Sequence, residues 1–290
     1  MASLKEIKER IASVRSTRKI TSAMKMVAAA KLHRAQREIG ALVPYADELQ
    51  SIVAHLAAGR MDEPIALAEE RDVSHLTVVG FASNTTFCGA FNNNVGRKIV
   101  EMLGSEEYAE LGAESRHILS MGRQLSVDLV RQKLQHECGD EHLAEKPNYL
   151  AYRTMADGLM KSYAEGHTDR VVLVYHKFLS PGVQRLVCEK LLPIELPKAD
   201  EAELSGVDYI LEPSRKELIE SIVPRQVALK LFTAALSSVA SEHAARMIAM
   251  QAATDNADEL AASLSLEYNK QRQQAITTEL LDMMGGKRES

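Results

Sequence analysis

Residues 4–39 read LKEIKERIASVRSTRKITSAMKMVAAAKLHRAQREI, without a glycine or a proline. Apolar residues recur there at three- and four-residue steps, which predicts an amphipathic helix. The stripe consists of Leu4, Ile7, Ile11, Val14, Ile20, Met24, Val27, Ala28 and Leu32. Ser3 followed by Glu6 fits a capping box, so we expect the helix to begin directly after Ser3. Beyond Pro44, where the helix can bend, the pattern resumes until Gly59 ends it.

A second uninterrupted stretch begins after Pro213. Ser214 and Glu217 fit another capping box, and the next glycine is Gly285. Only Pro224 could kink a helix of roughly 100 Å between them. Many of its residues are alanines, whose small side chains let helices approach closely. The larger apolar residues form a broken seam, less regular than a leucine zipper: Met247, Met250, Leu260, Leu264, Ile276, Leu280 and Met283.

The two terminal helices are expected to pair with each other. Each carries an apolar stripe that must be buried, and the N-terminal segment would span roughly 80 Å against roughly 100 Å for the C-terminal one. We therefore predict a long antiparallel α-helical coiled coil whose longer C-terminal helix projects at its tip.

The middle of the chain follows a different pattern. Runs rich in β-branched residues predict strands at 75–82, 117–121, 170–178, 183–194 and 207–211. Helical patterns lie between them at 93–103 and 149–163. This alternation predicts a central Rossmann-like α/β domain with a mostly parallel sheet.

We expect three segments in the chain. They are an N-terminal coiled-coil helix at 1–58, the central α/β domain at 73–212 and a C-terminal coiled-coil helix at 213–290. The polar or proline-containing stretches 59–71 and 195–205 are the candidate linkers.

Composition narrows the class of protein only moderately. The 290 residues are 46% hydrophobic and 26% charged, with a formal charge of −5 that conceals a strongly basic first helix. The three cysteines are scattered without metal-ligand spacing, and their odd number suits a reducing compartment. No run of about 18 apolar residues and no signal-peptide pattern is present, so we expect neither membrane insertion nor export.

A search for catalytic motifs finds little. The chain has no phosphate-binding GxxxxGK[ST] motif, and the glycines between Gly80 and Gly89 do not give GxGxxG. Cys88, at a predicted strand-to-helix turn, could be a nucleophile, although a small buried cysteine is the commoner case. The nine histidines show no HExxH or paired ligand spacing. We expect no cofactor and no metal.

The basic first helix allows one alternative function. A Lys/Arg-rich helix followed by a coiled coil superficially resembles a bZIP arm, which binds DNA. Against this, an apolar stripe runs through the basic segment, and a bZIP basic region lacks such a stripe. We therefore favour a solvated face or an acidic protein partner as the explanation of the charges.

Three stretches carry a resemblance to a known family. ITSAMKMVAAAKL at 20–32 resembles the N-terminal signature of the γ subunit of F-type ATP synthases. SEHAARMIAMQAATDNA at 241–257 and YNKQRQQAITTEL at 268–280 resemble its C-terminal signature. CGAFN at 88–92 is the main match in the middle. Together the stretches are highly specific, and the organisation matches over essentially the whole chain. Because the sequence begins directly at the helix, we expect a bacterial form without a transit peptide.

The resemblance implies a rotor in place of an enzyme. The coiled coil would sit inside a ring of three α and three β subunits, and the α/β domain would bind the ε subunit and the membrane c-ring. Catalysis would belong to the β subunits, and the chain would be peripheral, at the cytoplasmic face of the bacterial inner membrane. Proton flow would turn the shaft. The shaft can change the nucleotide affinity of a catalytic site only by as much as its contacts with that site differ between the site's states.

The resemblance also implies contact residues. Glu242 and Arg246 match positions that contact a β-subunit loop, as do Arg272, Gln273 and Thr277. Met24, beside Lys25, matches a position at the same contact where coupling is sensitive. Met24 could instead be core filler, and Glu242 with Arg246 could be an intrahelical pair worth ~0.3–0.5 kcal/mol. The tip would bear on the ring through Ile276, Leu280, Leu281, Met283 and Met284.

Two departures from the family pattern limit the resemblance. The charged stretch that often precedes the Cys-Gly motif is replaced by Asn84–Phe87, and a lysine common in the C-terminal signature is replaced by Gln251. The resemblance therefore does not imply a charged contact at these two positions, and it leaves open whether another basic residue replaces the lysine.

Overall fold

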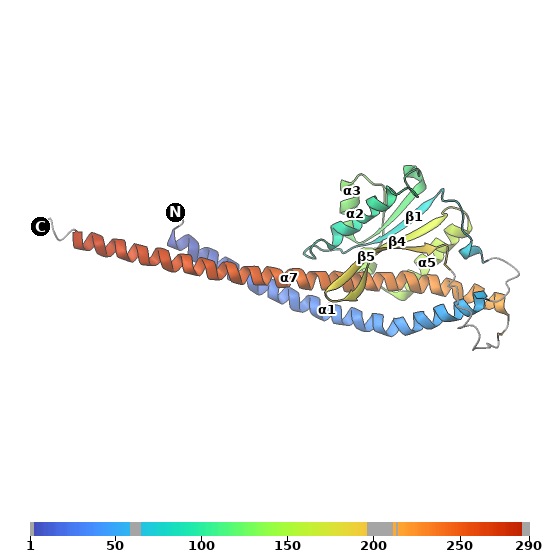
Figure 1. The fold of residues 1–290 in the computed structure, drawn as a ribbon, viewed down its shortest axis with the longest axis horizontal. Helices are drawn as coiled ribbons and strands as arrows, with labels where there is room; N and C mark the ends of the chain where they lie inside the picture. Colours follow the sequence, from blue (N-terminus) through green and yellow to red (C-terminus); the bar gives the residue numbers. More distant parts are fainter. Residues whose placement is uncertain (1–2, 59–64, 196–210, 213, 286–290) are drawn as a thin grey trace. The chain divides into compact units, whose positions relative to one another are not determined.

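A computed structural model describes residues 3–58, 65–195, 211–212 and 214–285. The chain divides into two compact units, one made of Met1–Ala29 with Arg246–Ser290 and the other of Ala30–Ala245. Two long helices, α1 (Leu4–Ala58) and α7 (Arg215–Gly285), each contribute residues to both units (Figure 1). The units are described separately below.

Both long helices begin as predicted. The Glu6 backbone N–H donates to Ser3 Oγ at 3.3 Å and the Ser3 N–H donates to Glu6 Oε2 at 2.8 Å, which is a complete capping box. The Glu217 N–H likewise donates to Ser214 Oγ at 3.3 Å. Pro44 and Pro224 lie inside α1 and α7, so neither proline ends its helix.

The larger unit contains a five-stranded sheet in the order β3-β2-β1-β4-β5. Its strands are β1 (Leu76–Phe81), β2 (Arg116–Met121), β3 (Glu137–Cys138), β4 (Arg170–Ser180) and β5 (Val183–Leu192). All neighbouring pairs are parallel except β4 with β5, so the predicted mostly parallel sheet is confirmed.

Four of the five predicted strands correspond to β1, β2, β4 and β5. Of the fifth, residues 207–210 lie outside the described part of the chain, and Leu211 is not in a strand. The two-residue β3 was not predicted from the sequence.

Helices cover both faces of this sheet. The other helices are α2 (Phe91–Leu103), α3 (Arg123–Arg131), α4 (Glu141–Glu145) and α5 (Tyr149–Ala164), with short 3-10 turns at Ala66–Ala68 and Ala113–Ser115. Val78 belongs to a core shared with α2 and α3, whereas its neighbour Val79 belongs to a core shared with α5 and α7. The helices α2 and α5 lie on opposite sides of the sheet (Figure 1). Because successive strand residues face opposite sides, every residue of β1 is buried.

The smaller unit is a two-helix coil with a seven-residue repeat. Ile7, Thr21 and Ala28 of α1 are buried at multiples of seven, and α7 buries three residues that are each seven apart. Those residues are Met250, Ala257 and Leu264. A repeat of seven is the pattern of a coiled coil.

Two bonds across the coil show that its helices are antiparallel. Thr21 Oγ1 lies 2.8 Å from Thr254 Oγ1, and Arg18 Nε lies 2.5 Å from Asp258 Oδ1. A step back along α1, from Thr21 to Arg18, is therefore a step forward along α7. The predicted antiparallel coiled coil is confirmed.

Part of the predicted apolar stripe was wrong. Ile20 and Val27 were expected in the buried stripe, but both side chains are 58% exposed. Ala28, which belongs to the predicted stripe, is buried in the seam, and Thr21, one residue after Ile20, is buried there although it was not predicted. Apolar residues are so frequent in this part of α1 that periodicity could not separate the buried face from the adjacent one.

None of the helices in the described residues is both long and apolar enough to cross a membrane.

Candidate functional site

The residues implied to contact partner subunits lie in both units. Met24 and Lys25 on α1, and Arg246, Arg272, Gln273 and Thr277 on α7, belong to the coil unit. Glu242 belongs to the larger unit.

Met24 and Lys25 are both half-buried in the coil. Met24 follows Thr21 by one helical turn, so its thioether side chain flanks the seam without filling it. It is therefore neither a core residue nor a freely exposed one. Such a position leaves part of the side chain available to a partner.

Arg272, Gln273 and Thr277 are all exposed on the last part of α7. Thr277 Oγ1 donates to the Gln273 carbonyl at 2.8 Å, which restricts its rotamer. Gln273 and Thr277 are four residues apart and share one face of the helix. All three side chains are accessible to a partner.

The structure does not bring all the coil residues to one point. Thr254 faces Thr21, close to Met24, and Arg272 lies 18 residues further along α7. At 1.5 Å per residue the separation is roughly 27 Å. Met24 and Arg272 therefore belong to separate stations along the coil.

The end of α7 presents apolar side chains to solvent. Ile276 is 46% exposed, Leu280 55%, Leu281 63% and Met283 73%. The side chain of Met284 lies outside the described part of the structure. Ile276, Leu280 and Met283 follow steps of four and three, so they share one face. In Figure 1 this part of α7 continues past the N-terminal end of α1. Clustered apolar side chains in water mark an interaction surface.

A second exposed apolar surface was missed from the sequence. Ile20, Met26 and Val27 of α1 are between 58% and 66% exposed. The available signal was the excess of apolar residues in 20–28, which is more than one buried face of a helix can hold.

Glu242 is buried, with 8% of its surface exposed. It lies where α7 is fastened to β4: the Phe178 N–H donates to Ser237 Oγ at 2.7 Å, and Ser241 Oγ donates to the His176 carbonyl at 3.0 Å. The free chain therefore does not offer the Glu242 side chain on an open surface.

The end of β1, where related α/β folds bind ligands, is filled by side chains. The Phe91 ring stacks on the His176 ring at a centroid distance of 4.3 Å. Cys88 is buried beside them, and Asn92 Nδ2 donates to its Sγ at 3.3 Å. Burial lowers the pKa of His176 to about 4, so the ring is neutral at pH 7. This geometry supports the packing interpretation of Cys88.

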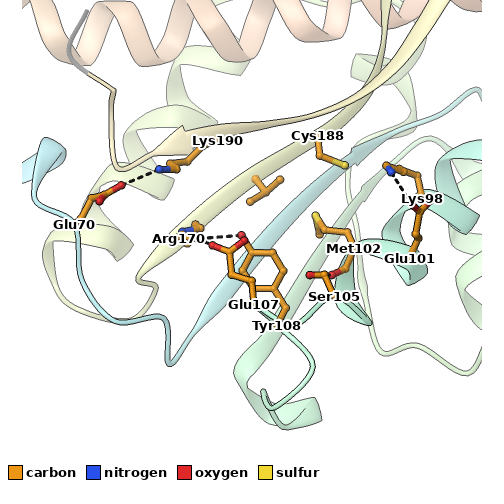
Figure 2. A pocket seen from close by; sticks show the side chains of 11 residues that line it. Glu70, Lys98, Glu101, Met102, Ser105, Glu107, Tyr108, Arg170, Cys188 and Lys190 are labelled. Carbon is orange, nitrogen blue, oxygen red and sulfur yellow. Dashed lines mark hydrogen bonds and ion pairs between the residues drawn. The ribbon is translucent and has the colours of Figure 1, made fainter. Parts of the chain in front are cut away.

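The larger unit also has an open cavity of about 590 Å³ between α2, β4 and β5 (Figure 2). Three ion pairs surround it: Lys98 with Glu101, Arg170 with Glu107, and Lys190 with Glu70. The Lys190 hydrogen bond lowers the pKa of Glu70, and the Glu101 hydrogen bond raises the pKa of Lys98.

The chemistry of this cavity is not that of a nucleophilic site. Burial raises the pKa of Cys188, which therefore faces the cavity as a thiol and not as the reactive thiolate. Each cation at the rim already has a carboxylate partner. Among the described residues, no group of three or more His, Cys, Asp or Glu side chains could hold a metal ion.

Comparisons with known proteins agree across the whole chain. A family model described as ATP synthase matches residues 3–288. The ATP synthase gamma chain of Bacteroides fragilis is 47% identical over 289 residues, covering 99% of each chain, and that of Phocaeicola vulgatus is 44% identical over 288 residues, covering 99% of each. Both relatives have nearly the same length as this chain.

Among solved structures, a chain of the Euglena gracilis mitochondrial ATP synthase, determined as OSCP/F1/c-ring in rotational state 3, is 20% identical with a TM-score of 0.64. The match covers 98% of this chain and 93% of the other. A chain from the rotor of the same synthase in rotational state 1 has a TM-score of 0.61 at 19% identity, covering 94% and 98%. At such identity the likeness concerns the fold. None of these matches favours the nucleic-acid alternative.

Proposed function

This chain belongs to the ATP synthase gamma-chain family, and on that premise we propose that it is the rotating shaft of a bacterial F1Fo ATP synthase. Proton flow through the membrane sector turns the shaft, and its asymmetric surface drives three catalytic sites through different nucleotide affinities. The chain itself catalyses nothing in this proposal. ATP is made or hydrolysed on the β subunits.

One observation carries the proposal beyond the family assignment. The coil ends in a single helix whose exposed side chains Ile276, Leu280, Leu281 and Met283 are apolar. Apolar surface makes few directional bonds, so it can turn inside a collar without breaking specific contacts at each step. Charged or hydrogen-bonding side chains there would hold the shaft at preferred angles.

A shaft must also transmit torque. Two helices packed along a seam with a seven-residue repeat resist bending and twisting better than one helix or a glycine-containing linker does. No glycine interrupts α7 before Gly285. The larger unit has hydrophobic cores on both faces of its sheet, so it can hold its shape when partners bind.

The partners follow from this proposal. A ring of three α and three β subunits surrounds the coil, and the larger unit binds the ε subunit and the c-ring of Fo. A solved relative was determined as an assembly of F1 with a c-ring. The chain is then peripheral to the membrane, on the cytoplasmic face of the inner membrane.

The contact residues divide by exposure. Arg272, Gln273 and Thr277 are exposed and therefore accessible to a β-subunit loop. Met24, Lys25 and Arg246 are half-buried, so a partner can reach only part of each side chain. Glu242 is buried in the free chain, so it contacts β only through a change at the α7–β4 junction.

The decisive experiment is the composition and activity of the assembled complex. Co-expression with α and β subunits should give an ATPase with one copy of this chain for every three α and three β, while the isolated chain hydrolyses no ATP. As a matched test, Leu280 and Leu281 are replaced by alanine or by aspartate. We expect the alanine variant to assemble and rotate, and the aspartate variant to lose activity through desolvated charge. An active isolated chain, or an ATPase lacking this chain at that stoichiometry, contradicts the proposal.

A further inference from the structure

Two bonds across the coil lie on consecutive helical turns. Thr21 Oγ1 and Thr254 Oγ1 are 2.8 Å apart inside the seam, where Thr21 is only 9% exposed. One turn away, Arg18 Nε and Asp258 Oδ1 are 2.5 Å apart, with both side chains about half exposed. We call these four residues the seam clamp.

The two threonine hydroxyls share three contacts. Thr254 Oγ1 lies 2.7 Å from the Met250 carbonyl, and Thr21 Oγ1 lies 3.1 Å from the Arg18 carbonyl. Each hydroxyl has one hydrogen, so one of them donates across the seam while the other donates to its own helix. The result is a chain of two hydrogen bonds that joins the seam to the backbone of one helix.

Neither threonine needs the other to satisfy its hydroxyl. If the helices separate or slide, Thr21 Oγ1 still has the Arg18 carbonyl at 3.1 Å, and Thr254 still has that of Met250. Both hydroxyls would therefore keep a hydrogen-bond acceptor without the bond between the helices. What it adds is a preference for one alignment of α1 against α7.

Apolar packing beside the seam clamp specifies that alignment weakly. Between the seam residues Met250 and Leu264, α7 has Ala257 buried in the seam and Ala253 and Ala261 half-buried. Alanine side chains are shallow knobs, so sliding the helices changes their contacts little. A polar pair in an apolar seam is a known way to fix the register of a coiled coil.

We propose that the seam clamp fixes the register of α1 against α7. The two helices then rotate together, and the apolar end of α7 keeps a fixed rotational position relative to Met24. This inference rests on the shaft function proposed above. Arg18, Thr21, Thr254 and Asp258 are positioning residues in it: they set where the contact stations lie and need not touch a partner themselves.

The test replaces both threonines by valine, which has the same shape without the hydroxyl. Losing one net hydrogen bond should lower the ratio of aligned to slipped coil about fivefold. In membrane vesicles with the complete complex, we expect ATP hydrolysis to persist while proton pumping per ATP falls. The melting temperature of the chain should stay the same or rise, because apolar replacements in a seam are commonly neutral or stabilising.

Two controls separate register from stability. Replacing both threonines by serine keeps the hydroxyls and should restore pumping. Thr17→Val removes a threonine whose Oγ1 also donates to its own helix, to the Ser13 carbonyl at 3.1 Å, but on the exposed face. It should pump normally. Normal pumping by the double valine variant, or equal losses in the serine or Thr17 controls, overturns the inference.

A measurement on the isolated chain tests the register without the complex. Spin labels at the exposed positions Glu9 and Glu267, with the three cysteines replaced by alanine, report the distance across the coil. We expect a single narrow distance distribution in the parent chain and the serine variant, and a shifted or second distribution in the valine variant. If the distance distribution of the valine variant is the same as that of the parent chain, the seam clamp is overturned, whether or not the complex assembles. If the parent chain fails to assemble with α and β, only the proposed shaft function is overturned.

Discussion

The helix α7 has two halves that are buried in different ways. In 227–244, fifteen of the eighteen residues are buried, because the sheet, α1 and α5 surround this part within the larger unit. In the described side chains after Arg246, only Met250, Ala257 and Leu264 are buried. Both halves have strong helix formers, so propensity does not distinguish them. Tertiary packing decides that one half is core and the other is a rod.

This contrast has a functional meaning. A core helix stabilises its unit through area, and any side chain removed from it leaves a cavity. A rod needs only its seam for stability and can give the rest of its surface to partners. Substitutions in the two halves of α7 should therefore affect different measurable properties.

The largest effect is expected from a matched pair of leucines. Leu231 is fully buried against the sheet, whereas Leu266 is 73% exposed on the rod. Leu231→Ala should lower the free energy of unfolding by about 2–5 kcal/mol through lost burial and a cavity. Leu266→Ala should change it by less than about 0.5 kcal/mol. Urea unfolding of the two variants checks this, and equal effects would remove the distinction between the halves.

The next effect concerns pH and the junction of α7 with β4. Burial lowers the pKa of His176 to about 4, against about 6.5 in an unfolded chain. Between these values the unfolded chain binds the proton and the folded one does not. The stability contribution is thus complete above pH 6.5 and is lost as the pH falls towards 4, by on the order of 2–3 kcal/mol.

His176→Phe keeps a flat ring against Phe91 and removes the titrating group. The test is the difference in unfolding free energy between the parent and the variant at several pH values. We expect the parent to lose stability more steeply than the variant between pH 6.5 and 4. Parallel pH profiles would mean that protonation of His176 is not linked to unfolding.

A smaller effect on stability but a clear one on coupling is expected at Met24. Lysine there places a second cation beside Lys25 at a half-buried position and should cost about 1 kcal/mol. Proton pumping should fall more than ATP hydrolysis, with Met24→Leu as the control that keeps both. An equal loss of pumping and hydrolysis in membrane vesicles would contradict a role in coupling.

The smallest effect is expected where the chain departs from the family pattern. Gln251 Nε2 donates to Asp255 Oδ1 at 2.6 Å within the rod. Gln251→Lys keeps a partner four residues away, so the unfolding free energy should change by less than about 0.5 kcal/mol. Gln251→Ala is the control that loses the bond. A change above 1 kcal/mol would show that a charge here acts on more than Asp255.

The long elements were predictable from the sequence because their signals are strong. Capping boxes and the absence of glycine predicted where α1 and α7 begin, and β-branched runs predicted β1, β2, β4 and β5. The short elements were not predictable: α4 has five residues behind an Asp140 cap, and α3 buries only Leu125 and Leu129. Patterns this short cannot be distinguished from the sequence of an ordinary loop.

The candidate contacts were predictable only through family motifs. Periodicity placed Ile20 and Val27 in the seam, because it measures how often apolar residues recur and not which face meets a partner. It also gave no sign that Thr21 is buried, since a hydroxyl on an apolar stripe is recognised only when Thr254 is seen opposite.

The seven-residue spacing on both helices has a mechanical consequence. A strict repeat of seven makes two α-helices wind around each other in a left-handed sense. Twisting such a pair further in that sense tightens it and presses its seam together, whereas the opposite twist unwinds it. The rod therefore has a stiff and a compliant direction of torsion. Single-molecule torque measured both ways should show two spring constants.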